Sequence, residues 1–339
     1  MKGELATEKE VSAGAAKLRK LSDALNDVLF GQETLIENVV TGLIARGHLL
    51  LESLPGLGKT ALIKALAQAL QLDAKRIQFT PDLLPGDITG NPIVQELDGR
   101  REFVFHPGPV FANLVLADEI NRASPKTQSA LLEAMQEQCV TVMGQTHPLP
   151  NPFFVLATQN PIELEGTYPL PEAQLDRFLF KLNVSRNNAS VLEEIVKNRE
   201  MGEFPAVKPV LQRDELLDLA SSARRIFLPD VVTNYIARIV DATHPESSQA
   251  ANGIKFGASP RAALGLAAGA RARALLNGRL NASFEEVQAI AVPVLQHRII
   301  LDYSARLEGR VPAEIVAAIL KEIPAQDRAL PKTLRAAKV

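Results

Sequence analysis

The sequence predicts an α/β domain followed by an all-helical domain. Short apolar segments alternate with amphipathic helical segments over the first 200 residues. A glycine-bearing loop at residues 53–60 lies between one such strand and the next helix. From about residue 185 onward only helical periodicity is expected. A chain of 339 residues fits about two domains of ordinary size.

The composition is that of a folded globular protein. Hydrophobic residues make up 46% and charged residues 22%, which excludes disorder or a coiled-coil rod for the whole chain. The formal charge of −2 gives no indication of a polyanionic partner. The single cysteine, Cys139, excludes an intrachain disulfide and a thiolate metal site. With a charged N-terminus and no apolar run of 18 residues, we expect a cytoplasmic protein without membrane insertion.

The first domain is expected to be a parallel sheet covered on both faces by helices. Apolar residues recur at helical spacing over 32–46, a strand follows at 48–51, and a helix is expected over 59–72. Ser124 and Pro125 are the N-cap and first-turn signals of a further helix. That helix is expected to span 125–137. Further short apolar strands are expected at 76–79, 114–117, 153–157 and 178–182.

Two β-hairpins interrupt this alternation. Residues 90–108 contain Asp98-Gly99 between two β-prone segments, which is a strong hairpin signal. Residues 139–149 have a similar pattern, with Gly144 as the expected turn. Both hairpins are expected to be insertions into the α/β scheme.

The C-terminal part is expected to be helical throughout. Helices are expected over 260–276 and 284–305, and Ser283 with Glu286 forms a capping box for the second of them. Residues 243–258 are expected to be a polar loop. The predicted organisation is therefore an α/β core at 1–200, a linker at 201–213 and a helical domain at 214–339.

The loop at 53–60 matches most of the phosphate-loop pattern. Gly58, Lys59 and Thr60 fit it, whereas Ser53 replaces its first glycine. Backbone N–H groups of 56–60 can surround a phosphate at a helix N-terminus. Lys59 would reach the β- and γ-phosphates of a nucleotide, and the Thr60 hydroxyl would hold Mg²⁺.

Two carboxylates end the predicted strand at 114–117. Asp118 is expected to bind Mg²⁺ and Glu119 to polarise the attacking water. A carboxylate at a strand end is common by itself, but its combination with a phosphate loop about 60 residues upstream favours nucleotide hydrolysis.

Three further polar residues allow a functional and a structural interpretation. Asn160 follows a strand and is placed to contact the γ-phosphate or the lytic water, although Asn-Pro is also a common turn. Arg177 is either a cation at a helix C-terminus or an arginine finger. Arg261 lies in the first turn of a helix, where a cation opposes the helix dipole, so we expect an anion nearby.

These residues, in this order, resemble the MoxR family of AAA+ ATPases. The resemblance covers nearly the whole chain from about residue 25. The matching stretches are Phe30-Gly31-Gln32, the segment 82–90, ADEINRA at 117–123, PKTQSALLEAM at 125–135, GTYPLPEAQLDRF at 166–178 and GASPRA at 257–262.

The resemblance implies a five-stranded sheet in the order 5-1-4-3-2 with a helical lid, and a ring, usually a hexamer, with ATP between subunits. It makes Arg177 the finger that reaches a neighbouring subunit and Arg261 a second sensor, in cis or in trans. The hairpins are expected to face the central pore. We expect ATP or ADP with Mg²⁺, the latter held by Thr60 and Asp118. The expected nucleotide contacts are Gly31, Gln32, Pro55, Gly56, Leu57, Gly58, Lys59, Thr60, Ala61 and Asp118, with Glu119, Asn160, Arg177 and Arg261 catalytic.

The expected function is an ATPase that remodels or matures partner protein complexes, together with a von Willebrand factor A domain partner. Three alternatives remain. A nucleic-acid motor is disfavoured because residues 95–101 carry two basic and two acidic side chains and 140–148 carry no Lys or Arg. A weakly hydrolysing scaffold is suggested by Ser53, where serine would cost about 1 kcal/mol if that position needs a positive φ. A small-molecule kinase has no acceptor-site motif to support it.

Overall fold

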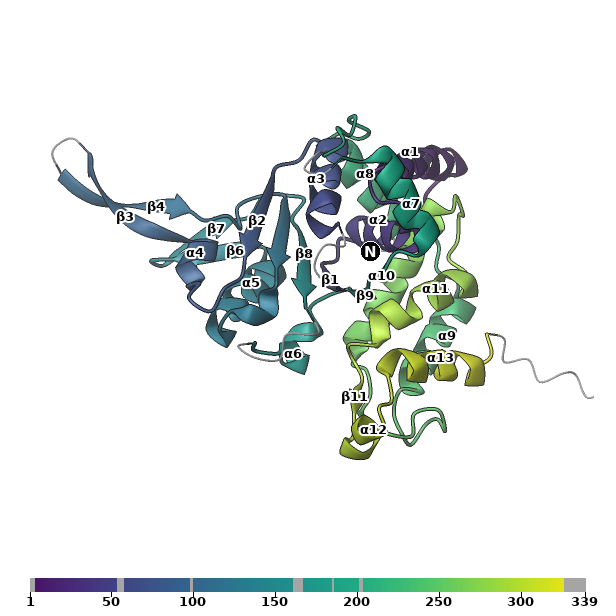
Figure 1. The fold of residues 1–339 in the computed structure, drawn as a ribbon. Coiled ribbons are helices and arrows are strands. Elements are labelled where there is room, and N and C mark those ends of the chain that lie inside the picture. Colours follow the sequence, from purple (N-terminus) through teal and green to yellow (C-terminus); the bar gives the residue numbers. More distant parts are fainter. Residues whose placement is uncertain are drawn as a thin grey trace, which may run out of the picture. The chain divides into compact units, whose positions relative to one another are not determined.

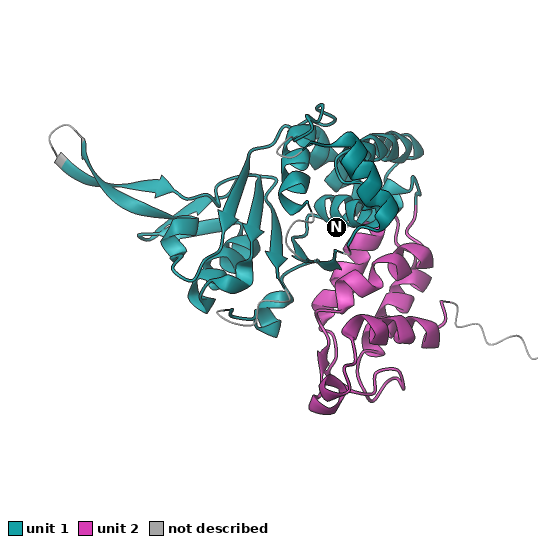
Figure 2. Ribbon diagram, viewed as in Figure 1, with its two compact units in different colours: residues 1–226, 272–280 teal, residues 227–271, 281–339 magenta. Residues whose placement is uncertain are grey.

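The computed structural model describes residues 4–53, 58–97, 100–160, 167–184, 186–200 and 204–325 of the chain (Figure 1). It forms two compact units: unit 1 comprises residues 1–226 and 272–280, and unit 2 comprises 227–271 and 281–339 (Figure 2). Within the described ranges, no helix is both long and apolar enough to cross a membrane.

Unit 1 contains a five-stranded sheet, two hairpins and the helices around them. Its elements are α1 (Glu8–Asn26), α2 (Glu33–Ile44), β1 (Leu49–Glu52), α3 (Lys59–Leu70), β2 (Ala74–Gln78), α4 (Pro85–Thr89), β3 (Gly90–Leu97), β4 (Arg100–Pro107), β5 (Leu114–Asp118), the 3₁₀ helix η1 (Ile120–Arg122), α5 (Pro125–Glu137), β6 (Cys139–Val142), β7 (Gln145–Pro148), β8 (Phe154–Gln159), α6 (Glu172–Leu175), β9 (Phe180–Asn183), α7 (Ala189–Asn198) and α8 (Arg213–Arg224).

The sheet has the order β2-β5-β8-β1-β9, and every neighbouring pair is parallel. Counting only these five strands along the chain, the order is 5-1-4-3-2, which confirms the predicted topology. All five residues of β5 are buried, because strands flank it on both sides and helices cover both faces. The carboxyl ends of β5, β8 and β1 therefore lie together at one edge of the sheet.

Successive residues of the central strands face opposite layers. Leu50, Val115 and Ala157 belong to a buried cluster with Leu131 and Met135 of α5. On the other face α3 contacts β2 and β5. Gly42 of α2 lies against Leu49, where a Cβ atom would come within 2.6 Å of a leucine methyl carbon. Asp118 has the same parity as Leu116 and so ends β5 on the face opposite α5.

Both predicted hairpins are present. β3 and β4 pair antiparallel from Gly90↔Pro107 to Leu97↔Arg100 and extend away from the sheet (Figure 1). The expected Asp98-Gly99 turn lies outside the described residues. In the shorter hairpin β6 pairs with β7, and Gly144 adopts a φ of 77° at the expected turn. Helix α5 begins and ends as predicted, with the Ser124 side chain accepting the Thr127 N–H.

Unit 2 is mostly helical, and it begins later than the expected lid boundary at residue 214. Its elements are α9 (Asp230–Asp241), β10 (Ile254–Phe256), α10 (Pro260–Leu276, whose last residues are counted with unit 1), α11 (Phe284–Leu295), β11 (Ile300–Leu301), α12 (Tyr303–Leu307) and α13 (Pro312–Glu322). Helix α8 belongs to unit 1, because Glu215 and Arg225 at its ends form ion pairs with Lys17 and Glu10 of α1.

Two expectations for the C-terminal part were wrong. The expected single helix over 284–305 ends at Leu295, and the predicted absence of strands is contradicted by β10 and β11, which pair antiparallel. The chain leaves the helix after Gln296 because Ile300 and Leu301 pair with Phe256 and Ile254, in the segment expected to be a loop. The capping box of Ser283 and Glu286 is confirmed.

Candidate functional site

The centre of the candidate site is the end of β5, where Asp118 faces the start of α3. Asp118 is buried, and its Oδ1 lies 3.8 Å from Lys59 Nζ. Lys59 is the first residue of α3 and belongs to the predicted phosphate loop. Asp118 belongs to the second predicted motif, the pair of carboxylates at the end of β5. The structure brings these motifs together, as expected for a strand and helix on either side of a phosphate loop.

Neighbouring strands hold both oxygens of Asp118. The Thr158 hydroxyl of β8 donates to Oδ1 at 2.7 Å. Arg76 of β2 donates to Oδ2 through Nη2 at 2.6 Å and through Nε at 3.2 Å. Because β2 and β8 flank β5, the strand order itself supplies these two contacts. The carboxylate is therefore fixed in orientation and neutralised by cations on two sides.

Glu119 is held in a left-handed backbone conformation with φ 57° and ψ 49°. Its N–H donates to the Thr158 hydroxyl at 2.9 Å, so this one hydroxyl contacts both carboxylate residues. Its Oε2 accepts from Gln78 Nε2 and from Arg122 Nη1, each at 2.9 Å. The Glu119 side chain thus lies within the ordered network at the sheet edge, with 18% of its surface exposed.

The described part of the phosphate loop has the geometry of a helix N-terminus that binds anions. Gly58 is the N-cap of α3 with φ 80°, a conformation that favours glycine. Lys59 and Thr60 follow in the first turn, where the N–H groups are not used within the helix. The predicted contacts Pro55, Gly56 and Leu57 lie outside the described residues.

Ser53 does not have a strained backbone. It is absent from the residues with positive φ in the described chain, and its N–H donates to the Gln159 carbonyl at 3.2 Å. The condition under which serine would be costly here is therefore not met. Its Oγ is buried without a hydrogen-bond partner among the described residues.

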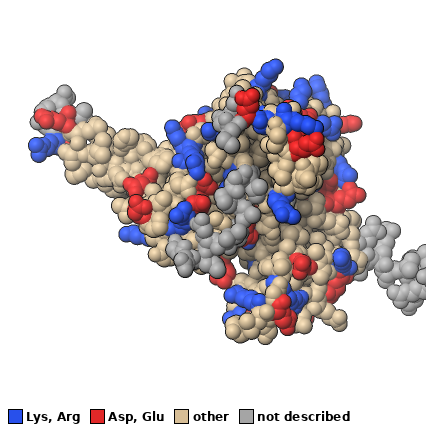
Figure 3. Space-filling view, viewed as in Figure 1, with Lys and Arg blue, Asp and Glu red and all other residues tan. Residues whose placement is uncertain are grey.

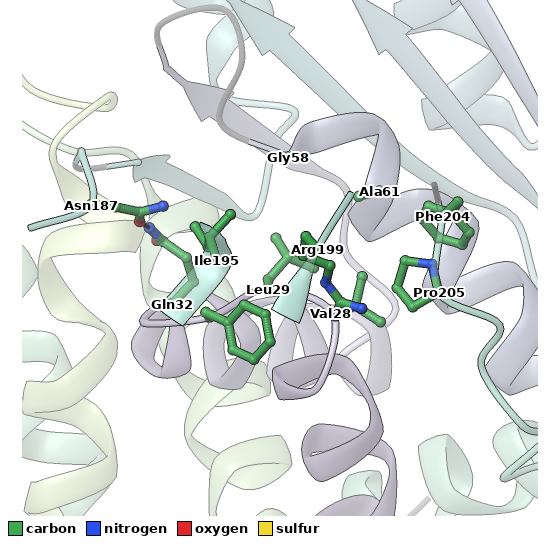
Figure 4. A pocket seen from close by; sticks show the side chains of 11 residues that line it. Val28, Leu29, Gln32, Gly58, Ala61, Asn187, Ile195, Arg199, Phe204 and Pro205 are labelled. Atoms are coloured by element: carbon green, nitrogen blue, oxygen red, sulfur yellow. Dashed lines mark hydrogen bonds between the residues drawn. The ribbon is translucent and has the colours of Figure 1, made fainter. Parts of the chain in front are cut away.

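A cavity of about 210 Å³ opens beside Gly58 and Ala61 (Figure 4). Gln32 projects into it and donates to Asn187 Oδ1 at 2.8 Å. The other lining residues are mostly apolar and come from the end of α1 and from α7 with the segment after it: Val28, Leu29, Phe30, Ile195, Arg199, Phe204 and Pro205. An apolar cavity with a few amide groups beside a phosphate-binding turn suits a nucleobase.

Gly31, between the lining residues Phe30 and Gln32, lies against Val191 of α7. Its φ is 67°, and a Cβ atom there would approach Val191 Cγ2 to 2.5 Å. Arg199 lies over the Phe30 ring, with its Cζ 5.0 Å from the centroid, and also donates to the Asp27 carbonyl. Of the predicted residues, Gln32, Gly58 and Ala61 thus line one cavity, and Gly31 is next to it in the chain.

The three remaining predicted residues lie at different places. Asn160 is buried just after β8, and its carbonyl accepts from Asn121 Nδ2 at 3.4 Å. Arg177 is half-buried just after α6, and its side chain makes no hydrogen bond or ion pair with the described residues. Arg261 is exposed in the first turn of α10, in unit 2.

The predicted metal ligands have the chemistry that Mg²⁺ requires. Asp118 and Thr60 both offer oxygen donors, and Mg²⁺ is bound through one or two such groups together with phosphates and water. No cluster of three or more His, Cys, Asp or Glu side chains suitable for a metal occurs in the described ranges, so a metal held by protein ligands alone is not indicated there.

Sequence reasoning missed several residues of this site. Thr158, Arg76, Gln78 and Arg122 contact the carboxylates, and Asn187 contacts Gln32. Thr158 lies two residues before Asn160, so its place on the same strand could have indicated it. Arg122 lies only three residues after Glu119 and is a local partner. The contacts of Arg76, Gln78 and Asn187 depend on strand order and on the path of the chain after β9, which no local pattern records.

The sequence also matches known families and proteins. Residues 48–180 match the ATPase family associated with various cellular activities (AAA), and residues 246–319 match the AAA lid domain. The chain is 42% identical to Chaperone MoxR1 of Mycobacterium tuberculosis, covering 95% of this chain and 89% of that protein. It is 32% identical to Protein MoxR of Paracoccus denitrificans, covering 92% and 97% of the two chains.

A solved structure shares the fold over nearly the full length. The crystal structure of a putative ATPase from Cytophaga hutchinsonii superposes with a TM-score of 0.86 at 39% identity, covering 94% of this chain and 97% of that one. Together with the phosphate loop, the paired carboxylates and the sheet order, these likenesses show that the chain belongs to the MoxR family of AAA+ ATPases.

Proposed function

We propose that this chain hydrolyses ATP with Mg²⁺ at the edge of the sheet between β5 and α3. The observation that carries this proposal is the approach of Lys59 Nζ to within 3.8 Å of Asp118, with Glu119 next in the chain. The phosphates would lie at the N-terminus of α3, where Lys59 and the backbone N–H groups neutralise them. The adenine base of the nucleotide would occupy the cavity lined by Gln32, Asn187 and Phe30.

In this proposal each residue has a separate task. Asp118 and Thr60 would hold Mg²⁺, whose charge supports the departing phosphate. Glu119 would accept a proton from the attacking water, and Asn160 would orient that water or the γ-phosphate. Gln78 and Arg122 hold Glu119 through its Oε2, so its other oxygen remains for the water. Arg76 holds Asp118 on the side away from Thr158.

Glu119→Gln tests this assignment. Glutamine keeps the size and hydrogen bonding of the side chain but is a very weak base, so we expect turnover to fall by roughly 10²–10⁴-fold. ADP affinity, measured by titration calorimetry, should remain within about threefold. A variant that hydrolyses ATP at the wild-type rate would remove Glu119 from the mechanism. A wild-type protein that binds ATP with no turnover would favour the scaffold alternative.

We further propose that the active site is completed between subunits of a ring, with Arg177 supplied to the neighbour. A half-buried arginine without a partner among the described residues of its own chain supports this assignment. Arg261 would sense the nucleotide from unit 2.

The proposed ring remodels partner protein complexes and acts with a von Willebrand factor A domain protein. The name of one MoxR relative, a chaperone, supports the remodelling role, and the von Willebrand factor A partner is carried over from the family resemblance. A purified von Willebrand factor A partner should raise the ATPase rate at saturating ATP, and a partner with its metal-binding carboxylates replaced should not.

The hairpins favour a protein client over a nucleic acid. At the outer end of the β3–β4 hairpin, exposed Glu96 pairs across the strands with exposed Arg101. Acidic and basic atoms lie beside each other there (Figure 3). A surface that grips phosphates would carry an excess of basic groups. Single-stranded DNA should therefore leave the ATPase rate unchanged, and a several-fold stimulation would support the motor alternative.

A further inference from the structure

Gln128 is a buried amide that contacts two separate parts of the site. It lies on α5 with 0% of its surface exposed. Its Nε2 is within hydrogen-bond distance of three backbone carbonyl oxygens: Ile120 at 3.2 Å, Ala123 at 3.1 Å and Tyr168 at 2.9 Å. An amide nitrogen has two protons, so one of them serves two carbonyls. Its Oε1 has no partner among the described residues.

The first part that Gln128 contacts is the turn that follows Glu119. Ile120 and Ala123 are at the two ends of this turn, which contains η1. Its geometry sets the left-handed backbone at Glu119, because the Arg122 N–H donates to the Glu119 carbonyl at 2.9 Å. The same turn carries Asn121, whose side chain donates to the Asn160 carbonyl at 3.4 Å.

The second part is the segment that leads to Arg177. Tyr168 is joined to the turn twice: its carbonyl accepts from Gln128, and its N–H donates to the Asn121 carbonyl at 2.6 Å. Further along, Gln174 Nε2 donates to Ser129 Oγ at 3.2 Å, and the Arg177 N–H donates to the Gln174 carbonyl at 3.2 Å. Two adjacent residues of α5, Gln128 and Ser129, therefore hold both ends of this segment.

We propose that Gln128 is a positioning residue that couples the turn after Glu119 to the segment that carries Arg177. A shift of the turn on nucleotide binding would move Tyr168, and with it the path of the chain toward Arg177. The state of a subunit's own site would thus determine how it presents Arg177 to its neighbour. This inference rests on the proposed function of Glu119 and Arg177.

A burial argument favours coupling over simple packing. A fully buried amide whose oxygen has no partner among the described residues is a costly way to fill a core position, since unsatisfied buried polar atoms cost roughly 1–3 kcal/mol. An apolar side chain of the same length would in turn leave the carbonyls of Ile120, Ala123 and Tyr168 without this donor. What an apolar side chain lacks is the ability to bond two segments at once.

The test uses Gln128→Met, which keeps length and removes the donor, and Gln136→Met as a matched control. Gln136 lies on the same helix, but it is exposed, and its side chain donates a hydrogen bond to its sequence neighbour Glu137. For Gln128→Met we expect ADP affinity within about threefold of wild type and kcat lowered by at least about tenfold. A purely structural role would lower the melting temperature while leaving kcat of the folded protein unchanged, and that result would overturn the proposal.

Subunit mixing tests the presentation of Arg177 directly. Arg177→Ala subunits keep their own phosphate site and need an arginine from a neighbour. Lys59→Ala subunits cannot hydrolyse ATP but can donate Arg177, so their mixture should recover activity. Lys59→Ala/Gln136→Met donors should recover as much, and Lys59→Ala/Gln128→Met donors less than about a tenth of it. Equal recovery with both double-mutant donors would contradict coupling. If the reference mixture recovers nothing although mixed rings form, the arginine does not act between subunits.

Hydrogen exchange decides the coupling in that last case, because it needs no partner subunit. In wild type, ADP should slow amide exchange both in peptides covering 119–123 and in peptides covering 167–178. In Gln128→Met, ADP should slow exchange only in 119–123. Nucleotide protection of 167–178 that is equal in wild type and Gln128→Met would overturn the proposal, whatever the mixing result.

Discussion

The conformation of Glu119 shows how single residues of this site depend on their neighbours. A left-handed backbone at a residue other than glycine costs roughly 1–2 kcal/mol and persists only where surrounding bonds enforce it. Here the Thr158 hydroxyl accepts the Glu119 N–H, and Gln78 and Arg122 hold its carboxylate. The strain turns the second carboxylate away from the strand direction, so that Asp118 and Glu119 can serve different tasks.

Thr158→Val should distinguish the effect of the Thr158 hydroxyl from the effect of the side chain's shape. Valine has the same shape, but it leaves the buried Glu119 N–H without an acceptor, at a cost of roughly 1–3 kcal/mol. We expect a lower melting temperature in thermal denaturation and kcat lowered by about tenfold or more. Thr158→Ser keeps the hydroxyl and should retain kcat within about threefold. A valine variant as active as the serine variant would show that the hydroxyl does not orient the carboxylates.

His48 makes the stability of unit 1 depend on pH. Its Nδ1 accepts the Val155 N–H at 3.0 Å, and its Nε2 lies 3.2 Å from the Met135 carbonyl, so the neutral ring fits. Burial lowers the pKa of His48 from 6.5 to about 4. The pKa of His48 is lower in the folded state than in the unfolded state. Its contribution to the free energy of unfolding is therefore complete above about pH 6.5 and is lost as the pH falls toward 4. The full loss is about 3 kcal/mol.

We therefore expect the free energy of unfolding to fall more steeply between pH 7 and pH 5 in wild type than in His48→Gln. Glutamine does not titrate, so the variant lacks this pH dependence, although its free energy of unfolding at pH 7 will be lower than that of wild type. Urea denaturation at several pH values measures the two slopes. Parallel slopes would mean that other groups account for the acid sensitivity.

At the scale of elements, the cavity beside Gly58 depends on α7 lying against the loop after α1. Gly31 permits this approach in two ways, because it adopts φ 67° and leaves room for Val191. Valine is stiff at χ1, so it cannot easily move away from an added Cβ. The hydrophobic face of α7 therefore meets the chain at Gly31 and brings Ile195 and Arg199 to the cavity.

Gly31→Ala should weaken nucleotide binding, and Gly144→Ala is its matched control. Both positions have positive φ, at 67° and 77°, but an added Cβ at Gly144 meets no atom within 4 Å. Both variants should lose about 1 kcal/mol of stability from the backbone. Only Gly31→Ala should also raise the Kd for ADP, by about fivefold or more. Adding Val191→Ala to the same chain should restore part of the lost ADP affinity. Equal ADP affinity in both variants would contradict a role for this contact.

At the scale of the whole molecule, we propose that a second subunit completes the site. Arg261 belongs to unit 2, and Arg177 has no partner among the described residues of its own chain. Asp118 and Glu119, by contrast, form side-chain hydrogen bonds with other residues of unit 1. This division is what a site completed by a second subunit would require.

The ATPase rate per subunit should then depend on protein concentration. If hydrolysis needs a neighbour's Arg177, the rate per subunit rises steeply where rings assemble and then reaches a plateau. ADP binding per subunit, measured over the same range, should vary much less, because the cavity and α3 belong to one chain. A rate per subunit that stays constant down to concentrations at which light scattering shows monomers would contradict a shared site.

Much of this arrangement follows from local sequence alone. Gly58-Lys59-Thr60 before an amphipathic helix, and an apolar strand ending in Asp118-Glu119, could be recognised because each motif is a short run of adjacent residues. Helix α5 was predicted to the residue for the same reason, since Ser124 and Pro125 mark its start. The two hairpins were also predictable from alternation and turn residues. The sheet order came instead from the resemblance to a known family.

Tertiary structure decided the rest. The expected helix over 284–305 ends early because Ile300 and Leu301 pair with a strand some 45 residues away. Arg76, Gln78 and Thr158 reach the carboxylates because β2 and β8 flank β5, and Gln128 joins two segments 40 or more residues apart. Such contacts depend on which segments the folded chain brings together. Local periodicity and turn chemistry carry no information about that, so only the structure could reveal them.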